Sequence, residues 1–146
     1  EEIAQWVSLD GRMQRAGHCT DAYAFNPDLQ ISAWGHNDDW SVYWRNETYF
    51  VIATAIGADG AAMFKFGSWG YPGYLPGMQL NWNSYGIAWT CNSLFPRRFL
   101  ESGVGTAWVA RHMLTAHSIE ELIRRAADAR VSTAMNYNIG NLSSKA

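Results

Sequence analysis

The chain of 146 residues is long enough for one domain with its own hydrophobic core. Its formal net charge is −2, and it has neither a basic stripe nor a run of 18 apolar residues, so we expect no nucleic-acid partner and no membrane span. Only 16% of the residues are charged, whereas 48% are hydrophobic and eight are Trp. Because so little of the surface can be charged, we expect the remainder of a longer chain to cover part of it.

The two cysteines, Cys19 and Cys91, could form one disulfide in a secreted protein. No charged start followed by an apolar stretch indicates a signal peptide. We therefore expect two free thiols in a reducing compartment, the cytoplasm.

The first half of the chain predicts a short helix followed by two hairpins. Residues 2–9 carry an apolar helical face, and a connector then leads to the first cysteine. A polar turn at Pro27 joins the first two strands, and a Gly-containing turn joins the second two. The predicted strands cover residues 20–25, 29–34, 48–56 and 61–66.

The second half predicts a loop, a strand, two helices and a last strand. Residues 67–77 contain four Gly and two Pro, which is typical either of a plain connector or of an aromatic rim over a pocket. A turn at Asn83-Ser84 precedes the strand at 85–93, and the last strand covers 132–139. Hairpins followed by a helix pair and another strand predict an α+β domain, with helices on an antiparallel sheet.

The two predicted helices each carry an apolar stripe. Ser118, with Glu121 three residues later, has the spacing of a capping box and starts the second helix. The helix at 104–116 is expected to pack Val104, Ala107, Trp108, His112 and Leu114, and the next one Ile119, Leu122, Ile123, Ala126 and Ala127.

Two short stretches carry the chemistry: Gly-His-Cys-Thr-Asp at 17–21 and Gly-His-Asn-Asp-Asp-Trp at 35–40. The first is a thiol at the start of a strand. The second is expected to end the antiparallel partner strand, so that the hairpin returns a carboxylate and two or three polar side chains toward the sulfur. Two alternatives remain open on spacing alone, because a cysteine is often a small buried hydrophobe and Asn-Asp-Asp is often a turn.

These stretches resemble the start of the catalytic chain of N-terminal-nucleophile cysteine hydrolases, the group of the choloylglycine hydrolases and the isopenicillin N acyltransferase-like family. Tyr-Pro-Gly-Tyr-Leu-Pro-Gly at 71–77 and Asn-Ser-Tyr-Gly-Ile-Ala at 83–88 are similar to the branch that hydrolyses β-alanyl-dopamine and carcinine. The resemblance implies a four-layer αββα sandwich, incomplete in this chain. It also implies that residues 1–18 end the segment before the nucleophile, and that 19–146 are the truncated N-terminal part of the catalytic chain.

The resemblance assigns catalytic roles to Cys19, Asp39 and Asn92. Cleavage before Cys19 would free an α-amine, and this amine would act as the base for the thiol. Asp39 would hydrogen-bond the amine and the thiol, and Asn92 would donate to the oxyanion. His18 stands where relatives commonly have Gly, so self-cleavage is expected by analogy only.

The same resemblance implies a small-molecule amide as substrate, with no cofactor and no metal. The expected substrate-binding residues lie on the second stretch and on the aromatic loop: His36, Asn37, Asp38, Trp69, Tyr71 and Tyr74. Aromatic walls suit a ring-bearing amine, and Asp38 is a candidate partner for a β-alanyl ammonium. The remainder of the same chain is an expected partner, a homodimer is compatible with the sequence, and the 146 residues alone are expected to be inactive.

Three other functions stay open. An acyltransferase differs only in which molecule accepts the acyl group from Cys19. A metal hydrolase could be built on residues 36–39, although no second cluster has ligand spacing. A secreted Trp- and Tyr-rich β module could bind sugars, with Cys19 and Cys91 bridged and Asn46 glycosylated.

Overall fold

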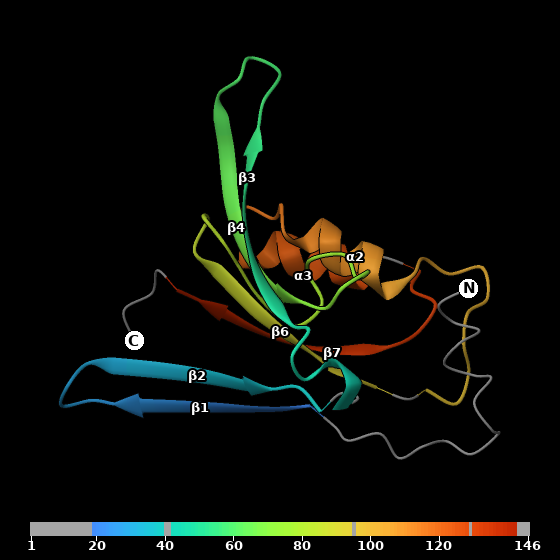
Figure 1. Ribbon diagram of the computed structural model, residues 1–146, viewed down its shortest axis with the longest axis horizontal. Coiled ribbons are helices and arrows are strands. Elements are labelled where there is room, and N and C mark those ends of the chain that lie inside the picture. The colour runs from blue at the N-terminus through green and yellow to red at the C-terminus, as the bar shows by residue number, and fades with distance from the viewer. Residues whose placement is uncertain (1–18, 40–41, 95, 129, 143–146) are drawn as a thin grey trace.

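The computed structural model describes residues 19–39, 42–94, 96–128 and 130–142 (Figure 1). Its elements follow in the order β1 (Thr20–Asn26), β2 (Ile31–Asn37), η1 (Val42–Trp44), β3 (Tyr49–Ile56), β4 (Ala62–Gly70), β5 (Leu80–Asn83), β6 (Ile87–Ser93), α2 (Thr106–Met113), α3 (Ile119–Asp128) and β7 (Met135–Asn141). The predicted α+β class is confirmed.

The strands form two antiparallel sheets. β1 and β2 make a two-stranded sheet, and the other five make a sheet in the order β3-β4-β5-β6-β7. α2 and α3 cover one face of the five-stranded sheet, and the β1–β2 hairpin lies on the opposite side, beside β6 and β7 (Figure 1). The described residues thus form a helix layer, a large sheet and a small sheet.

Alternation along β6 separates the core from the polar face of the large sheet. Ile87, Trp89 and Cys91 point to the helices and are buried. Thr90 and Asn92 alternate with them and face the hairpin. Thr90 donates to Asp21 of β1, and Asn92 donates to the backbone carbonyl of Cys19, just before β1. The core on the helix side is completed by Phe66, Val109, Met113, Leu114, Ala116 and Leu122.

Asn83 connects the large sheet to the helix layer. Its side-chain amide donates to the backbone carbonyls of Leu114 (3.1 Å) and Ala116 (2.9 Å), and its Oδ1 accepts from the backbone N–H of Tyr85. The side chain is 1% exposed. It therefore satisfies two carbonyls in the connection between α2 and α3 that water cannot reach.

The loop after β4 is fixed by buried polar side chains. Ser68 Oγ donates to Asn81 Oδ1 (2.7 Å) and accepts from the backbone N–H of Gly77 (2.9 Å). Gly77 has φ +127°, and a Cβ there would lie 2.7 Å from the carbonyl carbon and oxygen of Ala110. Both the backbone angle and this close approach to α2 require glycine.

Several sequence predictions need correction. The strand at Leu80–Asn83 was not predicted, because four residues with two asparagines carry no strand pattern, and the loop predicted from 67 begins only after Gly70. Within the predicted apolar surfaces, Trp108 is 66% exposed and Val104 46% exposed. His112 is also exposed, and exposed Ile123 (49%) and Ala127 do not belong to the buried stripe of α3.

Of the two hydrogen bonds of the capping box predicted for α3, the structure contains one. The backbone N–H of Glu121 donates to Ser118 Oγ at 3.1 Å. The Glu121 carboxylate instead accepts from the backbone N–H of His117 at 2.8 Å. The helix predicted at 2–9 lies outside the described residues. No helix in the described ranges is long and apolar enough to cross a membrane.

Candidate functional site

The Cys19 thiol lies against a carboxylate, just beyond the last residue pair of the β1–β2 ladder. Cys19 Sγ donates to Asp38 Oδ1 at 3.3 Å, and the Tyr71 hydroxyl donates to Asp38 Oδ2 at 2.7 Å. The ladder ends with Thr20 opposite Asn37, so Cys19, just before Thr20, and Asp38, just after Asn37, lie one position beyond that last pair. Asp38 therefore joins the thiol to the aromatic loop after β4.

The surroundings keep this thiol protonated at neutral pH. Burial raises the pKa of Cys19, and the negative charge of Asp38 raises it further. The backbone N–H groups of Asp39 and Ser93 face the sulfur and act in the opposite direction. Burial and the hydrogen bond to Asp38 likewise raise the pKa of the Tyr71 hydroxyl, which stays a donor.

Asn92 reaches Cys19 from the end of β6. Its Nδ2 donates to the backbone carbonyl of Cys19 at 3.2 Å. Its Oδ1 accepts from Asn138 Nδ2 of β7 at 3.4 Å, which fixes the orientation of the amide. An oriented amide donor beside the thiol is the kind of group that stabilises a tetrahedral oxyanion.

Asp21 is the centre of the polar contact between the hairpin and the large sheet. Its Oδ1 accepts from Trp34 Nε1 (2.9 Å) and Thr90 Oγ1 (2.7 Å), and its Oδ2 accepts from Asn138 Nδ2 (2.8 Å). Burial alone would raise the pKa of this carboxyl, but the hydrogen bonds from Thr90, Trp34 and His36 outweigh it and lower the pKa. Asp21 is therefore an ionised carboxylate that holds β1 on β6 and β7.

His36 lies opposite Asp21 in the β1–β2 ladder. Its Nδ1 is 3.2 Å from Asp21 Oδ2, and its side chain is 4% exposed. The second nitrogen, Nε2, is buried and has no hydrogen-bond partner among the described residues.

A cleft of about 390 Å³ opens beside Asp38. Gln79 lines it, and its Oε1 is another buried acceptor without a partner in the described part of the chain. The wall combines aromatic rings with polar groups: His36, Asn37, Asp38, Trp44, Arg45, Thr48, Trp69, Tyr71, Gln79 and Leu80.

Most of the residues predicted for the site come together around this cleft. His36, Asn37, Asp38, Trp69 and Tyr71 line it. Tyr74 does not, but its ring packs edge-on against Tyr71, with centroids 6.2 Å apart.

Asp38 and Asp39 lie differently from the sequence expectation. The side chain beside the thiol is that of Asp38, whereas exposed Asp39 accepts from Asn37 Nδ2. Successive residues at a strand end point to opposite sides, so only one of the two acids can face the sulfur.

Sequence reasoning missed Asp21, Thr90, Asn138 and Gln79. Asp21 is two residues after Cys19 and so shares its face of the strand, which is a signal that alternation could have supplied. Thr90 and Asn138 face each other in the β6–β7 register, and that pairing is not visible in the sequence.

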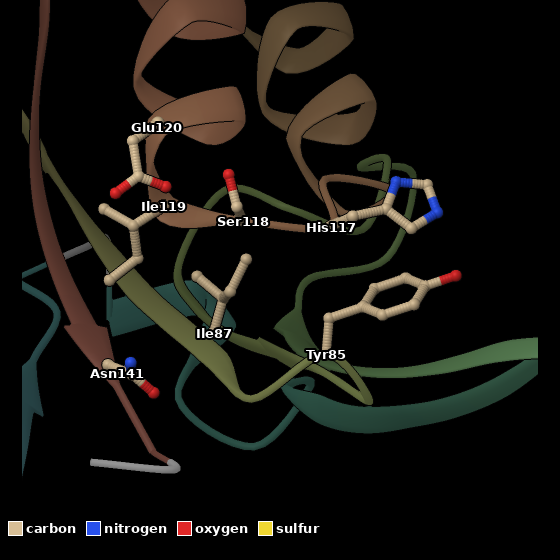
Figure 2. A pocket seen from close by; sticks show the side chains of 7 residues that line it. All are labelled: Tyr85, Ile87, His117, Ser118, Ile119, Glu120 and Asn141. Carbon is tan, nitrogen blue, oxygen red and sulfur yellow. The ribbon is translucent and has the colours of Figure 1, made fainter.

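A second hollow lies away from the thiol, between α3 and the turn before β6 (Figure 2). The rings of His117 and Tyr85 pack there at a tilt of 46°, with centroids 4.3 Å apart, and Ser118 and Glu120 also line the hollow. No residue predicted for the site lines it. No group of three or more His, Cys, Asp or Glu that could hold a metal ion occurs among the described residues.

A family model described as acyl-coenzyme A:6-aminopenicillanic acid acyl-transferase matches residues 26–146. The chain belongs to this family. The match contains Asp38, Asn92 and Asn138, and it begins seven residues after Cys19. A search for similar curated proteins finds no match.

Membership of the acyl-transferase family indicates an enzyme of the N-terminal-nucleophile type, an acyltransferase or an amidohydrolase. Both reactions pass an acyl group through a nucleophile. The Cys19 thiol, the oriented amide of Asn92 and the carboxylate of Asp38, which lines the cleft, are groups that suit such a transfer.

Proposed function

We propose that the protein is a cysteine amidohydrolase that cleaves linear amides through Cys19. The observation that carries this proposal is the set of contacts around Cys19: a carboxylate on the sulfur and an oriented amide on its backbone, at the edge of a cleft. In the complete protein these layers would belong to a four-layer αββα sandwich. The described residues form a helix layer and two sheets, which is compatible with part of such a sandwich.

The first chemical step would be attack of the sulfur on the amide carbonyl carbon. A protonated thiol is a weak nucleophile, so the proton must leave as the bond forms. Self-cleavage before Cys19 would create an α-amine next to the sulfur, and such an amine titrates near neutral pH, at about 8. Asp39, together with Asp38, would then orient this amine, and Asn92 would donate to the oxyanion.

The proposed substrates are β-alanyl amides of biogenic amines such as dopamine and histamine. Trp44, Trp69 and Tyr71 give the cleft flat walls, which suit an aromatic amine by stacking. The unpartnered Gln79 Oε1 and the carboxylate of Asp38 are acceptors for the ammonium of a β-alanyl group. Arg45 is the cation among the lining residues. Because its side chain is exposed, solvent screens its charge, and it repels a cationic ligand only weakly.

Acyl transfer to an amine is the second candidate function, because the family model that matches carries the name of an acyltransferase. The nucleophile and the first step are the same for both. The reactions are separated by adding an acceptor amine and measuring whether amide product forms in place of acid.

The proposal is tested in the full-length protein with Cys19→Ala and Cys91→Ala. Cys19→Ala is expected to abolish release of dopamine from β-alanyl-dopamine. Cys91 is buried in the core away from the cleft, so Cys91→Ala is expected to retain most of the activity. Normal turnover by the Cys19 variant would refute a thiol mechanism.

The substrate class is tested by comparing β-alanyl-dopamine with butyryl-dopamine, which has a methyl group in place of the ammonium. Gln79→Leu should raise KM for the β-alanyl amide by about tenfold, because it removes one buried acceptor, and should leave KM for the butyryl amide almost unchanged. Equal effects on both would refute recognition of the ammonium, and the proposal would return to a linear amide of unspecified acyl group.

A further inference from the structure

An acid–imidazole pair lies one step along the hairpin from the thiol. Side chains alternate along a strand, so Cys19 and Asp21 share one face of β1. Asp38 and His36 share the corresponding face at the end of β2. Across the hairpin, Asp38 accepts from Cys19, and His36 lies against Asp21. Positions two residues apart on a strand are separated by about 7 Å. The imidazole therefore neighbours the reacting sulfur without touching it.

The partners of Asp21 fix which nitrogen of His36 carries the proton. Asp21 is ionised and can only accept, since Trp34 and Thr90 already donate to Oδ1 and Asn138 to Oδ2. The His36 nitrogen that faces it, Nδ1, must then donate. In the neutral ring this leaves a lone pair on Nε2, the atom without a partner in a residue that lines the cleft.

We propose that His36 Nε2 is the proton acceptor for the second half of the reaction, when water attacks the acyl group on Cys19. This inference rests on the proposed function. As the water oxygen bonds to the thioester carbonyl carbon, its proton passes to Nε2. The intermediate collapses with cleavage of the carbon–sulfur bond, and the proton returns from the imidazolium to the departing sulfur through a water between them. Thioester and water become acid and thiol.

The geometry assigns His36 to this step and not to activation of the thiol. The hydrogen bond of Cys19 goes to Asp38, whereas His36 lines the cleft, where a water or an acceptor amine can lie. The titratable and charged groups around the imidazole are Asp21, Asp38, Cys19, Tyr71 and Arg45. The two carboxylates stabilise the imidazolium as it forms, and Asp21 is its positioning residue.

The test separates the two halves of the reaction with p-nitrophenyl acetate, which acylates a thiol whatever amide the enzyme prefers. The full-length His36→Gln protein should release a burst of about one p-nitrophenolate per active site. Its steady-state rate should then be about 10²–10⁴-fold below that of the wild type. Mass spectrometry should find an acetyl group that accumulates on Cys19. His117→Gln, an exposed histidine in the second hollow, is the matched control and should not change either phase.

A steady-state rate equal to that of the wild type would overturn the role of His36, and so would loss of the burst. Cys19→Ala gives no burst if the proposed function holds, so a burst from that variant would refute Cys19 and not His36. Should His36→Gln fail to fold, ¹⁵N spectra of histidine in the wild-type protein decide the matter. They are assigned by substituting the other histidines. We expect the neutral ring to be protonated on Nδ1, and a proton on Nε2 would overturn the proposal.

Discussion

At the scale of single residues, Asp38 controls the reactivity of Cys19 through charge. Its carboxylate accepts a hydrogen bond from the thiol, and its negative charge raises the pKa of Cys19. Only burial raises this pKa more. Both effects favour the neutral thiol in the resting protein. A neutral thiol beside an anion is protected from alkylation and oxidation until a base removes its proton.

We therefore predict that Asp38→Asn makes the thiol more reactive toward iodoacetamide. Removing the negative charge lowers the pKa of Cys19, so the thiolate fraction at pH 7.5 rises, by about tenfold for each unit of pKa. The measurement is the alkylation rate between pH 6 and 10, with Cys91→Ala in the background. Amide turnover of the same variant should fall, because the carboxylate no longer orients the site.

Tyr71→Phe is the matched control for this experiment. It removes the other hydrogen bond to Asp38 and keeps the negative charge. Alkylation of Cys19 should then not accelerate. If both variants alkylate faster to the same extent, the effect comes from loss of packing over the thiol and not from the charge.

At the scale of elements, the small sheet depends on close contact with β7. A Cβ at Gly140 would lie 2.9 Å from Cζ3 and 3.3 Å from Cε3 of Trp34, whose indole is held by Asp21. Trp34 cannot move without losing that hydrogen bond. The absence of a side chain at Gly140 is thus what allows the hairpin to reach the polar face of the sheet.

Gly140→Ala is expected to destabilise the protein by about 1–3 kcal/mol, the usual cost of overpacking, and to lower turnover as β1 shifts. Thermal unfolding and kcat are the two measurements. Gly35→Ala, on the hairpin itself, is the control: nothing lies within 4 Å of its Cβ, and its φ is not in the left-handed region. A Gly140 variant as stable and active as the Gly35 variant would show that the contact is not needed.

The connection between α2 and α3 depends on Asn83. Asn83→Ala should lower the free energy of unfolding by about 2–3 kcal/mol, because two buried carbonyls lose their donor. Chemical denaturation measures this. Ser84→Ala is the neighbouring control, since exposed Ser84 only accepts from the backbone N–H of Lys65. Equal losses in the two variants would contradict this role of Asn83.

Much of this element pattern could be predicted from the sequence, because hairpin turns and apolar periodicity are local. The β1–β2 and β3–β4 hairpins, both helices and the last strand follow from them. β5 could not be predicted, because its two asparagines are not typical of a strand. They hydrogen-bond the carbonyls of Gly77 and of Leu114 at the end of α2, and only the fold brings these partners close. The prediction that Trp108 is buried was wrong, because an apolar residue at helical spacing need not be buried.

The sequence predicts which two motifs form the site. It does not predict which of their side chains contact one another. The two motifs contain Cys19, His36 and Asp38, and they do meet. Which acid faces the sulfur depends on the register of the hairpin, and a shift of one residue would exchange Asp38 for Asp39. Alternation places Asp21 on the same face of β1 as Cys19, but its partners Thr90 and Asn138 lie on β6 and β7, so no local pattern could reveal those contacts.

At the scale of the whole molecule, the proposed chemistry requires a chain that begins at Cys19. We predict that purified full-length protein contains such a chain, and that Cys19→Ala retains the uncut precursor, because the thiol itself would attack the preceding carbonyl. N-terminal sequencing and intact mass measure both. Fully active protein that contains only the precursor would remove the α-amine from the mechanism and leave His36 and the carboxylates as the available bases.

The partners of Asp21 are far apart along the chain: Thr90 lies 69 residues away and Asn138 lies 117 residues away. At a synthesis rate of about 5–20 residues per second, Asn138 leaves the ribosome on the order of ten seconds after Asp21. Until Thr90 is synthesised the carboxylate has only hairpin partners, and until Asn138 is synthesised Asn92 lacks the partner that orients its amide. A nascent chain can therefore carry Cys19 for many seconds without a working site. We therefore predict that the proposed self-cleavage waits for β7, and that a chain interrupted before β7 remains uncut.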